Sequence, residues 1–312
     1  LSYLFTHLSI FSNANSLKGS IQHIVMLQKA KLLLKTSRPV LWLWFAFPFI
    51  AGAVIGGAGM SNPWIWAQFI ALGPLYGLVV YGINDVYDYE TDRLNERKGS
   101  AHGEILEPET HSFVLKSCAT ASALLLLIAS LTGSIVTLAG MAGLLLFAVA
   151  YSVPPIRLKD RAPLDSISNG IAYILLPGVM GHALGSPVTT LPPEAFWLAF
   201  ATMGLHSATT IMDYESDRKA GINTFSVRFG PEGAAGFAIA ALGATLLFSP
   251  INSFTARFIL LQLLAGVVVM ALDIRGYREL APGTRDRLIL LVYGEGVLLG
   301  TLYLLRFPAG LI

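Results

Sequence analysis

The chain has 312 residues, of which 54% are hydrophobic and only 13% are charged. A soluble domain carries about 25% charged residues, so this composition excludes an ordinary soluble globular protein and indicates a polytopic membrane protein. The single cysteine, Cys118, excludes an internal disulfide and a cysteine-based metal site. The formal net charge of +2 says little by itself, and no nucleic-acid partner is expected.

The first residues differ in composition from the rest of the chain. The sequence begins with Leu1, and the stretch Phe11–Ser16 is polar and irregular. It lacks the basic segment and cleavage site of a signal peptide. Met26 begins a more conventional start, just before a basic stretch. We therefore expect residues 1–29 to be a poorly ordered N-terminal extension and residues 30–312 to form one domain.

Apolar runs follow one another along this domain. Nine of them are long enough, or nearly so, to cross about 30 Å of hydrocarbon. Several contain Gly and Pro, which membrane helices tolerate. The sequence thus predicts an all-α membrane protein with nine transmembrane helices. The expected spans are residues 40–58, 64–86, 113–130, 135–151, 165–184, 194–212, 234–249, 258–274 and 288–305.

Positive charges gather in alternate loops. They precede the first expected span and follow the second, fourth, sixth and eighth, whereas the other loops carry few. Lys and Arg concentrate on the cytoplasmic side of membrane proteins, so the pattern predicts a cytoplasmic N-terminus and an external C-terminus. The expected location is a bacterial plasma membrane, with the lipid bilayer as a partner.

A group of oxygen ligands closes the second apolar run. Asp85, Asp88 and Asp92 follow each other at i, i+3 and i+7, and Asn84 lies one turn before Asp88. On a helix this spacing predicts a stripe of ligands at the membrane surface. Oxygen-only ligands suit Mg²⁺, which usually shares its coordination shell with substrate phosphates.

A second group closes the sixth run, where Asp213-Tyr-Glu-Ser-Asp217 nearly repeats Asp88-Tyr-Glu-Thr-Asp92. Carboxylates at the end of an apolar run are costly and mark a functional site by default. The alternative is an ion-pair network at the helix ends, with Arg93, Arg97 and Arg218. The repetition favours a metal site, with two bound ions or one shared ion.

Many cations lie near these acids in the sequence. A metal site surrounded by cations is typical of diphosphate binding, and it would ionise an allylic diphosphate while an apolar cavity holds the hydrocarbon. For Arg157 and Lys159, which follow a Pro-Pro turn, the alternative is a purely topogenic role. The candidate diphosphate ligands are Arg93, Arg97, Lys98, Arg157, Lys159, Arg218 and Lys219.

Three further polar residues lie in or near the expected spans. Asp165 is either an N-cap of the fifth span or a polar group at the mouth of the site. Asn169 lies one turn further along and could hydrogen-bond within the cavity. His206 lies seven residues before Asp213, on the same face but deeper, and a buried, hydrogen-bonded role is the alternative to a role in the acceptor pocket.

At these residues the chain resembles the UbiA superfamily of intramembrane prenyltransferases. The two motifs read Asn84-Asp85-x-x-Asp88-x-x-x-Asp92 and Asp213-x-x-x-Asp217. The resemblance begins near residue 30. It implies nine helices in a single bundle around a central cavity that opens to the lipid. It also implies that the acids hold two Mg²⁺ ions and that the cytoplasmic loops cap the diphosphate.

Within the superfamily the chain is similar to carotenoid (lycopene) elongases. The stretches that carry this similarity are Ser37–Pro39, Asn84–Asn95, Tyr151–Lys159, Leu164–Gly170 and Asp213–Gly221. Glu96 and the run Asn223–Ser226 depart from the expected pattern, and both bear on the acceptor. The resemblance implies that an isoprenyl diphosphate, best dimethylallyl diphosphate, alkylates a lipophilic acceptor such as lycopene. The expected catalytic residues are Asp85, Asp88, Asp213 and Lys159.

Other functions use parts of the same pattern. A quinone, chlorophyll or ether-lipid prenyltransferase would share the metal site and differ in the acceptor. Few polar residues are expected to face the cavity, which favours a hydrocarbon acceptor. A transporter would need charges at the midplane of the membrane, whereas these acids lie at one face. A non-catalytic scaffold would not need intact acidic motifs.

Overall fold

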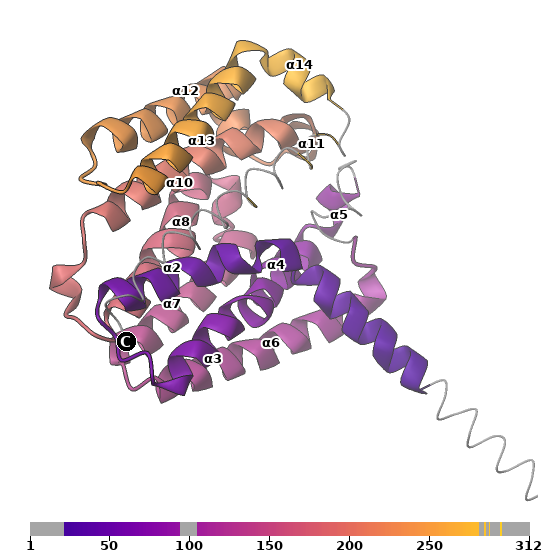
Figure 1. Ribbon diagram of the computed structural model, residues 1–312. Coiled ribbons are helices and arrows are strands. Elements are labelled where there is room, and N and C mark those ends of the chain that lie inside the picture. Colours follow the sequence, from indigo (N-terminus) through magenta and orange to yellow (C-terminus); the bar gives the residue numbers. More distant parts are fainter. Residues whose placement is uncertain (1–21, 94–104, 281–283, 285–286, 288–293, 295–312) are drawn as a thin grey trace, which may run out of the picture.

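The computed structural model describes residues 22–93 and 105–280, together with residues 284, 287 and 294. These residues form helices joined by turns and short connections, and no β-strand occurs among them (Figure 1). The all-α prediction is therefore confirmed for this part of the chain. In chain order the helices are 22–36, η1 (Pro39–Leu41), α2 (Trp42–Ile55), α3 (Pro63–Leu72), α4 (Pro74–Tyr87), α5 (Tyr89–Asp92), α6 (Pro108–Leu131), α7 (Ile135–Ser152), η2 (Leu158–Asp160), α8 (Leu164–Gly170), η3 (Ile171–Leu175), α9 (Leu176–His182), η4 (Val188–Thr190), α10 (Glu194–Thr210), η5 (Ile211–Asp213), α11 (Tyr214–Ala220), α12 (Phe225–Phe248), α13 (Phe254–Leu272) and α14 (Ile274–Glu279).

Five helical segments of the described chain are long and apolar enough to cross a membrane, and Ala256–Leu272 is a shorter apolar helix. The expected count of nine is not confirmed. The fifth and sixth expected spans form shorter helices, and the ninth, 288–305, lies almost entirely outside the described residues. The five long segments are Gln22–Ile55, Pro63–Tyr87, Pro108–Leu131, Ile135–Ser152 and Phe225–Phe248.

Two expected spans are interrupted for local reasons. In 64–86, α3 ends before Gly73 and α4 begins at Pro74. Proline lacks a backbone N–H and clashes with the preceding turn, so it begins a new helix instead of continuing one. In 165–184 a π-helical turn, η3, joins α8 to α9. Such turns widen the helix locally and recur at functional sites.

Small residues let neighbouring helices approach closely. A Cβ atom at Gly181 of α9 would collide with the Phe49 carbonyl of α2, and one at Gly204 of α10 would press on Ala238 and Ala241 of α12. Close backbone contact of this kind drives association of membrane helices, since lipid tails provide no hydrophobic force between them. The glycines therefore fix the distance between the helices that surround the site.

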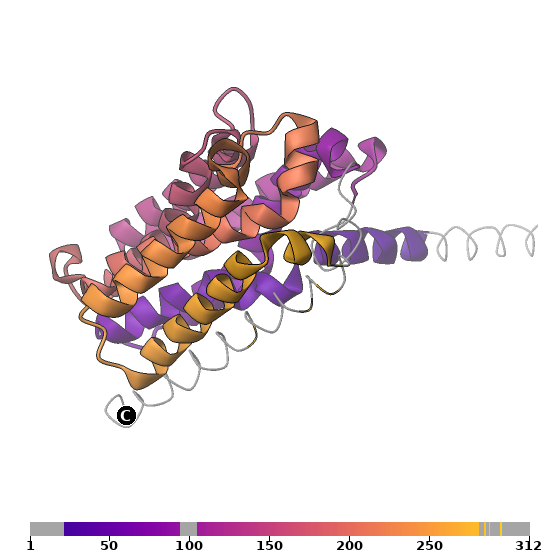
Figure 2. The ribbon, with the colours of Figure 1, turned by 90° about the horizontal axis from the view of Figure 1, so that it is seen from above.

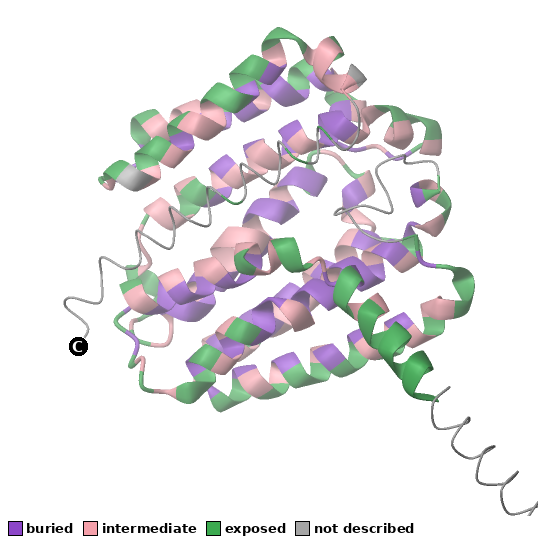
Figure 3. Cartoon of the chain, turned by 45° about the vertical axis from the view of Figure 1, so that its right-hand side comes forward, coloured by how far each residue is buried: buried purple, intermediate pink, exposed green. Residues whose placement is uncertain are grey.

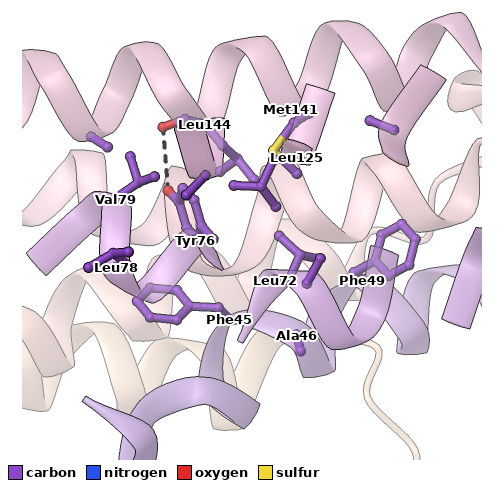
Figure 4. Packing of buried hydrophobic residues seen from close by; sticks show 14 of the residues in the cluster. Phe45, Ala46, Phe49, Leu72, Tyr76, Leu78, Val79, Leu125, Met141 and Leu144 are labelled. Carbon is purple, nitrogen blue, oxygen red and sulfur yellow. Dashed lines mark hydrogen bonds between the residues drawn. The ribbon is translucent and has the colours of Figure 1, made fainter. Parts of the chain in front are cut away.

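The buried apolar residues form two clusters, one in each half of the described chain. The first joins α2, α3, α4, α6, α7 and α9, and the second joins α10, α12 and α13. In the first cluster Phe45 packs edge-on against Tyr76, whose hydroxyl donates to the Leu144 carbonyl at 3.4 Å (Figure 4). The candidate site lies where elements of the two halves face each other.

The outer faces of the helices carry large apolar side chains. Leu146, Leu247, Phe248 and Leu272 are among the exposed ones, whereas buried residues line the sides on which helices meet (Figure 3). Seen from above, α12 and α13 run beside each other (Figure 2). An apolar exterior over long apolar helices is the surface expected of a protein that sits in lipid.

The N-terminal helix 22–36 projects from the bundle, and residues 22–31 are exposed (Figure 1). Residues 22–29 were predicted to be poorly ordered, and this part of the prediction differs from the helix observed. The stretch Met26–Leu34 contains Leu, Gln, Lys and Ala, which are strong helix formers. The remainder of the predicted extension lies outside the described residues.

Four of the basic loops meet at one end of the bundle. Arg157 and Lys159, after α7, pair with Asp88 at the end of α4. Arg278, after α13, pairs with Glu215 after α10. The short helices α5 and α11 also contact each other at this end (Figure 1). The charged loops therefore share one side, as the alternation of charge in the sequence requires.

Candidate active site

A cavity of about 950 Å³ opens between the two halves of the molecule. Apolar and aromatic side chains line most of it, and a group of charged and amide side chains lines the part near the basic loops. Both acidic motifs contribute, so the structure brings together residues that lie more than a hundred positions apart in the chain. The charged and amide residues of the lining include Arg38, Asn84, Asp88, Asp92, Lys159, Asp213, Asp217 and Asp273.

The first motif keeps helical register across the junction of α4 and α5. The backbone N–H of Asp88 bonds to the Asn84 carbonyl at 2.9 Å, and that of Asp92 bonds to the Asp88 carbonyl at 2.7 Å. The Asn84 amide also donates to the Asp88 carboxylate at 2.7 Å. Residues four apart share a helix face, so these three side chains all reach the cavity.

Asp85 lies apart from them. Its side chain is fully buried and is not part of the cavity lining, and its Oδ1 accepts a hydrogen bond from Arg38 Nη2 at 2.8 Å. Asp85 is one residue from Asn84, and that step turns its side chain by about 100° around the helix. The sequence predicted one stripe of four ligands, whereas the structure divides it into three cavity residues and one ion-paired residue.

Arg38 was missed as a site residue, although the similarity to elongases included Ser37–Pro39. Its guanidinium lies 4.0 Å from the centre of the Tyr81 ring, and Arg38 lines the cavity. Its φ of 51° is a left-handed conformation that non-glycine residues seldom adopt. Such strain persists only where the surroundings enforce it. No spacing rule could have placed this residue beside Asp85.

Two cations converge on Asp88. Arg157 Nη2 lies 3.3 Å from Asp88 Oδ1, and Lys159 Nζ pairs with Oδ2. Arg157 also has a positive φ, of 40°, while Lys159 is buried in the short helix η2 and lines the cavity. A buried ammonium needs a partner. Both residues contact the first motif, and only Lys159 lines the cavity; that they bind a diphosphate stays a prediction.

The second motif has a different environment. Asp213 ends η5, and Asp217 accepts a hydrogen bond from the Thr224 hydroxyl at 3.1 Å. Burial, and then the neighbouring Asp213, raise the pKa of Asp217 to about 7, while Lys159 acts in the opposite direction. A bound cation would reverse this shift, since positive charge favours the ionised carboxylate.

Asp160 of η2 and Asp165 of α8 hold the segment that follows the second motif. Asp165 Oδ2 accepts from the Phe225 backbone N–H at 2.7 Å, and Asp160 Oδ1 accepts from the Asn223 N–H at 2.5 Å. Asp165 therefore satisfies the backbone N–H of the first residue of α12. Both alternatives weighed for Asp165 in the sequence differ from this role. The contact fixes the segment that carries Thr224.

Among the described residues, the predicted cations Arg93, Arg218 and Lys219 are not part of the cavity lining. Arg93 is exposed and lies over the Tyr89 ring, 5.6 Å from its centre. Arg218 pairs with Glu215 at 3.3 Å on the outer side of α11, and Lys219 is exposed. Charge in a loop does not by itself reveal the direction of a side chain. Arg97 and Lys98 lie outside the described residues.

A polar wall lies deeper in the cavity. His206 Nδ1 is 3.1 Å from Ser166 Oγ, and His206 Nε2 is 3.3 Å from the Tyr151 hydroxyl. Asn169 donates to the Asp165 carbonyl at 2.7 Å and also lines the cavity. His206 and Asn169, the two residues predicted for the acceptor pocket, both line this cavity, and their role in binding the acceptor stays a prediction. The expectation of few polar residues was wrong, since Tyr151, Ser168, Asn169, Thr202, His206 and Thr209 all line it.

The donor set suits Mg²⁺ in its chemistry. Five oxygen-bearing side chains from the two motifs line one cavity, and Mg²⁺ prefers carboxylates that it shares with phosphate and water. Within the described part of the chain, no three acidic, histidine or cysteine side chains already converge on one point as a ready-made cation site. The five oxygen donors are of the kind that Mg²⁺ binds when it shares its coordination shell with a phosphate-bearing substrate.

The model of the UbiA prenyltransferase family matches residues 45–293. A lycopene elongase/hydratase of Corynebacterium glutamicum is 29% identical over 214 residues, which are 67% of this chain and 73% of that protein. The chloroplastic chlorophyll synthase of Arabidopsis thaliana is 30% identical over 248 residues, 74% of this chain and 61% of that protein.

A solved structure supports the fold. A UbiA homolog from Archaeoglobus fulgidus, bound to DMAPP and Mg²⁺, superposes with a TM-score of 0.66 and covers 89% of this chain and 98% of its own. The two sequences are 22% identical. At this level of identity the likeness concerns the helical architecture.

Proposed function

The chain belongs to the UbiA prenyltransferase family, and we propose that it transfers an allylic group, best dimethylallyl, from its diphosphate to a hydrophobic acceptor in a Mg²⁺-dependent reaction. The observation that carries this proposal is the convergence of both acidic motifs and Lys159 on one cavity of about 950 Å³. The family is one of membrane enzymes, and the apolar helices agree with that setting.

We assign the Mg²⁺ ligands to Asn84, Asp88, Asp92, Asp213 and Asp217. Two motifs with five donors are enough to share two ions with a diphosphate. When bound, Mg²⁺ supplies the positive charge that stabilises the departing diphosphate. The solved homolog from A. fulgidus is bound to both DMAPP and Mg²⁺, which supports the same pair of ligands here. Asp85 acts in this scheme through Arg38, as a positioning residue.

The two cations that contact Asp88 complete the donor site, and of these Lys159 lines the cavity. Lys159 and Arg157 pair with Asp88 in the structure, and a diphosphate that enters between them offers additional oxygen acceptors. Charge-assisted hydrogen bonds to such oxygens are roughly twice as strong as neutral ones. Both cations thereby favour the breaking of the allylic C–O bond, since negative charge accumulates on the diphosphate as the bond breaks.

The acceptor assigned to the apolar part of the cavity is a linear carotenoid such as lycopene. The relative from C. glutamicum is named a lycopene elongase/hydratase, and so is one from Haloferax volcanii that is 30% identical over 76% of this chain. Aromatic lining by Trp44, Tyr76, Phe147 and Tyr173 suits an extended hydrocarbon and a carbocation.

The polar wall favours one alternative acceptor. A tetrapyrrole acid would find hydrogen-bond partners in Tyr151, Asn169 and His206, and two relatives are named chlorophyll synthase and bacteriochlorophyll synthase 33 kDa chain. We rank this second, because a lycopene elongase/hydratase of Haloarcula japonica is 35% identical to the chain, against 30% and 32% for the two synthases. The assigned orientation puts the acidic motifs and the N-terminus in the cytoplasm and the C-terminus outside.

The test is expression of the chain in lycopene-producing bacteria. The expected result is a carotenoid longer than lycopene by one or two five-carbon units, identified by chromatography and mass. A parallel strain carries Asp88→Asn and accumulates unmodified lycopene. If lycopene persists in both strains while a chlorophyll or quinone precursor becomes prenylated, the carotenoid assignment is wrong and the prenyltransferase assignment stands.

A further inference from the structure

The polar wall contains a hydrogen-bonded group of three side chains that the donor chemistry leaves without a role. His206 of α10 lies between Ser166 of α8, 3.1 Å from Nδ1, and Tyr151 of α7, 3.3 Å from Nε2. His206 and Tyr151 line the cavity, whereas Ser166 is fully buried behind them. Three helices therefore fix an imidazole at the cavity surface.

The depth of His206 matches the position of the reacting carbons. It lies seven residues before Asp213 on a nearly continuous helix, a distance of about 10 Å along the axis. The diphosphate of the donor occupies the level of the acids, so the allylic carbons extend toward His206. The imidazole is thus placed beside the new carbon–carbon bond, away from the leaving group.

The hydrogen bonds leave one ring nitrogen able to accept a proton. With Nδ1–H donating to Ser166, the lone pair of Nε2 points toward Tyr151 and the cavity. The contact between Nε2 and the Tyr151 hydroxyl is long for a bond involving O–H, and that hydroxyl can rotate away. Among the lining residues that the structure describes, His206 alone carries an imidazole.

We propose that His206 accepts the proton whose loss ends the prenyl transfer, with Ser166 as its positioning residue; this inference rests on the proposed carotenoid elongation. The allylic C–O bond breaks and its electron pair leaves with the diphosphate. The π pair of the acceptor alkene forms the new C–C bond and creates a tertiary cation. A neighbouring C–H bond then gives its electrons to a new double bond, and its proton passes to Nε2.

The same group serves a water-capture branch. A water molecule in the polar wall adds through its oxygen lone pair to the tertiary cation, and the resulting oxonium loses a proton to Nε2. The product is then an alcohol in place of an alkene. Both branches form one imidazolium and consume no oxidant or reductant. The proton leaves His206 when the diphosphate and product depart and water enters the cavity.

The experiment compares His206→Gln with His182→Gln in membranes supplied with labelled dimethylallyl diphosphate, Mg²⁺ and lycopene. His182 is a matched control, because it is also buried in a membrane helix, bonds to Thr190 at 3.0 Å and lies outside the cavity lining. Two quantities are measured: donor consumed, including release of dimethylallyl alcohol, and elongated carotenoid formed. Their ratio reports the fate of the cation.

His206→Gln is expected to lower the ratio of elongated product to donor consumed on the order of a hundredfold, while His182→Gln keeps the wild-type ratio. An unchanged ratio in His206→Gln would overturn the inference. If that variant fails to fold, Ser166→Ala is measured in its place. We then expect a lowered ratio, and an unchanged ratio would contradict the role of His206 as proton acceptor. Failure of the carotenoid function itself is distinguishable, because wild type and His182→Gln then form no elongated product either.

Discussion

The two acidic motifs are nearly identical in sequence and differ in how their charges are compensated. In the first, Asp85 pairs with Arg38, and Asp88 pairs with Arg157 and Lys159. In the second, the ion pairs to Arg218 and Arg278 involve Glu215 on the outer side of α11. Asp217 instead takes a hydrogen bond from Thr224 and carries a pKa raised to about 7.

This difference indicates that the two motifs have different roles in metal binding. The first motif is held by cations before any ligand arrives, so its carboxylates are already placed. The second motif keeps two neighbouring carboxylates in a half-buried position, which raises the free energy of the metal-free protein and favours cation binding. Repeated letters therefore do not imply repeated roles. Substitutions of Asp88, Asp85, Lys159 and Asp217 test this difference between the motifs. Two of them are measured through activity and two through stability.

The largest effect is expected for Asp88→Asn. It removes the carboxylate that Lys159, Arg157 and Asn84 share, and with it a predicted metal ligand. Such losses amount to several kcal/mol of transition-state stabilisation, which corresponds to a fall in kcat/KM on the order of 10³-fold. The measurement is Mg²⁺-dependent diphosphate release. Glu90→Gln, two residues away and exposed, should retain activity, and equal activity in both variants would remove Asp88 from the mechanism.

Asp85→Ala should act on stability. Removing one member of a buried ion pair leaves the other charge uncompensated and costs about 3–5 kcal/mol, here at Arg38. Thermal and denaturant unfolding of the solubilised protein measure the loss, and the double variant Asp85→Ala with Arg38→Met should recover part of it. A stable but inactive Asp85→Ala protein with weakened Mg²⁺ binding would instead make Asp85 the metal ligand that the sequence suggested.

Lys159→Gln should have an intermediate effect. A hydrogen bond to a charged group contributes about 1.5–3 kcal/mol, so kcat/KM for the donor should fall roughly 10- to 100-fold. Lys219→Gln is the control, because Lys219 is exposed on α11 and lies outside the cavity lining. Steady-state kinetics with the donor varied at saturating acceptor separates the two. An equal loss in both variants would return Lys159 to a topogenic role.

The smallest effect is expected for Asp217→Asn, measured as thermal stability in the absence of metal. Because the folded-state pKa of Asp217 is raised to about 7, ionisation destabilises the folded protein, and the penalty grows from the unfolded pKa up to about pH 7. Asp217→Asn removes it. In EDTA the variant should melt a few degrees higher than wild type at pH 8, with a smaller difference at pH 5. A larger difference at pH 5 would contradict the assigned cause.

The sequence indicated the site well where helical spacing was sufficient. Asn84, Asp88 and Asp92 share a face because they are four residues apart, and His206 follows Asp213 along one helix. Helical spacing alone could not show that Asp85 lies outside the cavity lining. The side chain of Asp85 is held by Arg38, whose φ is 51°, and this contact is known only from the folded structure.

Loop charges were the least predictable part. Arg157 reaches Asp88 because the turn before η2 directs it inward, whereas Arg218 points outward to Glu215. In the sequence, both are basic residues that follow an apolar run. The break at Gly73 and the π-turn at Ile171–Leu175 also depend on packing and on proline, so continuous spans were expected there. Of the polar wall, Asn169 and His206 were predicted, whereas Tyr151, Ser166 and Ser168 were not, because the residues of the wall are scattered over α7, α8 and α10.

The central claim is that both motifs together activate an allylic diphosphate for transfer to a lipophilic acceptor. The most direct measurement incubates membranes with labelled dimethylallyl diphosphate and lycopene, with Mg²⁺ or with EDTA, and follows label in the carotenoid fraction. We predict label in a longer carotenoid with Mg²⁺, and its loss in EDTA, in Asp88→Asn and in Asp213→Asn. Transfer that persists in EDTA or in either variant would contradict the account.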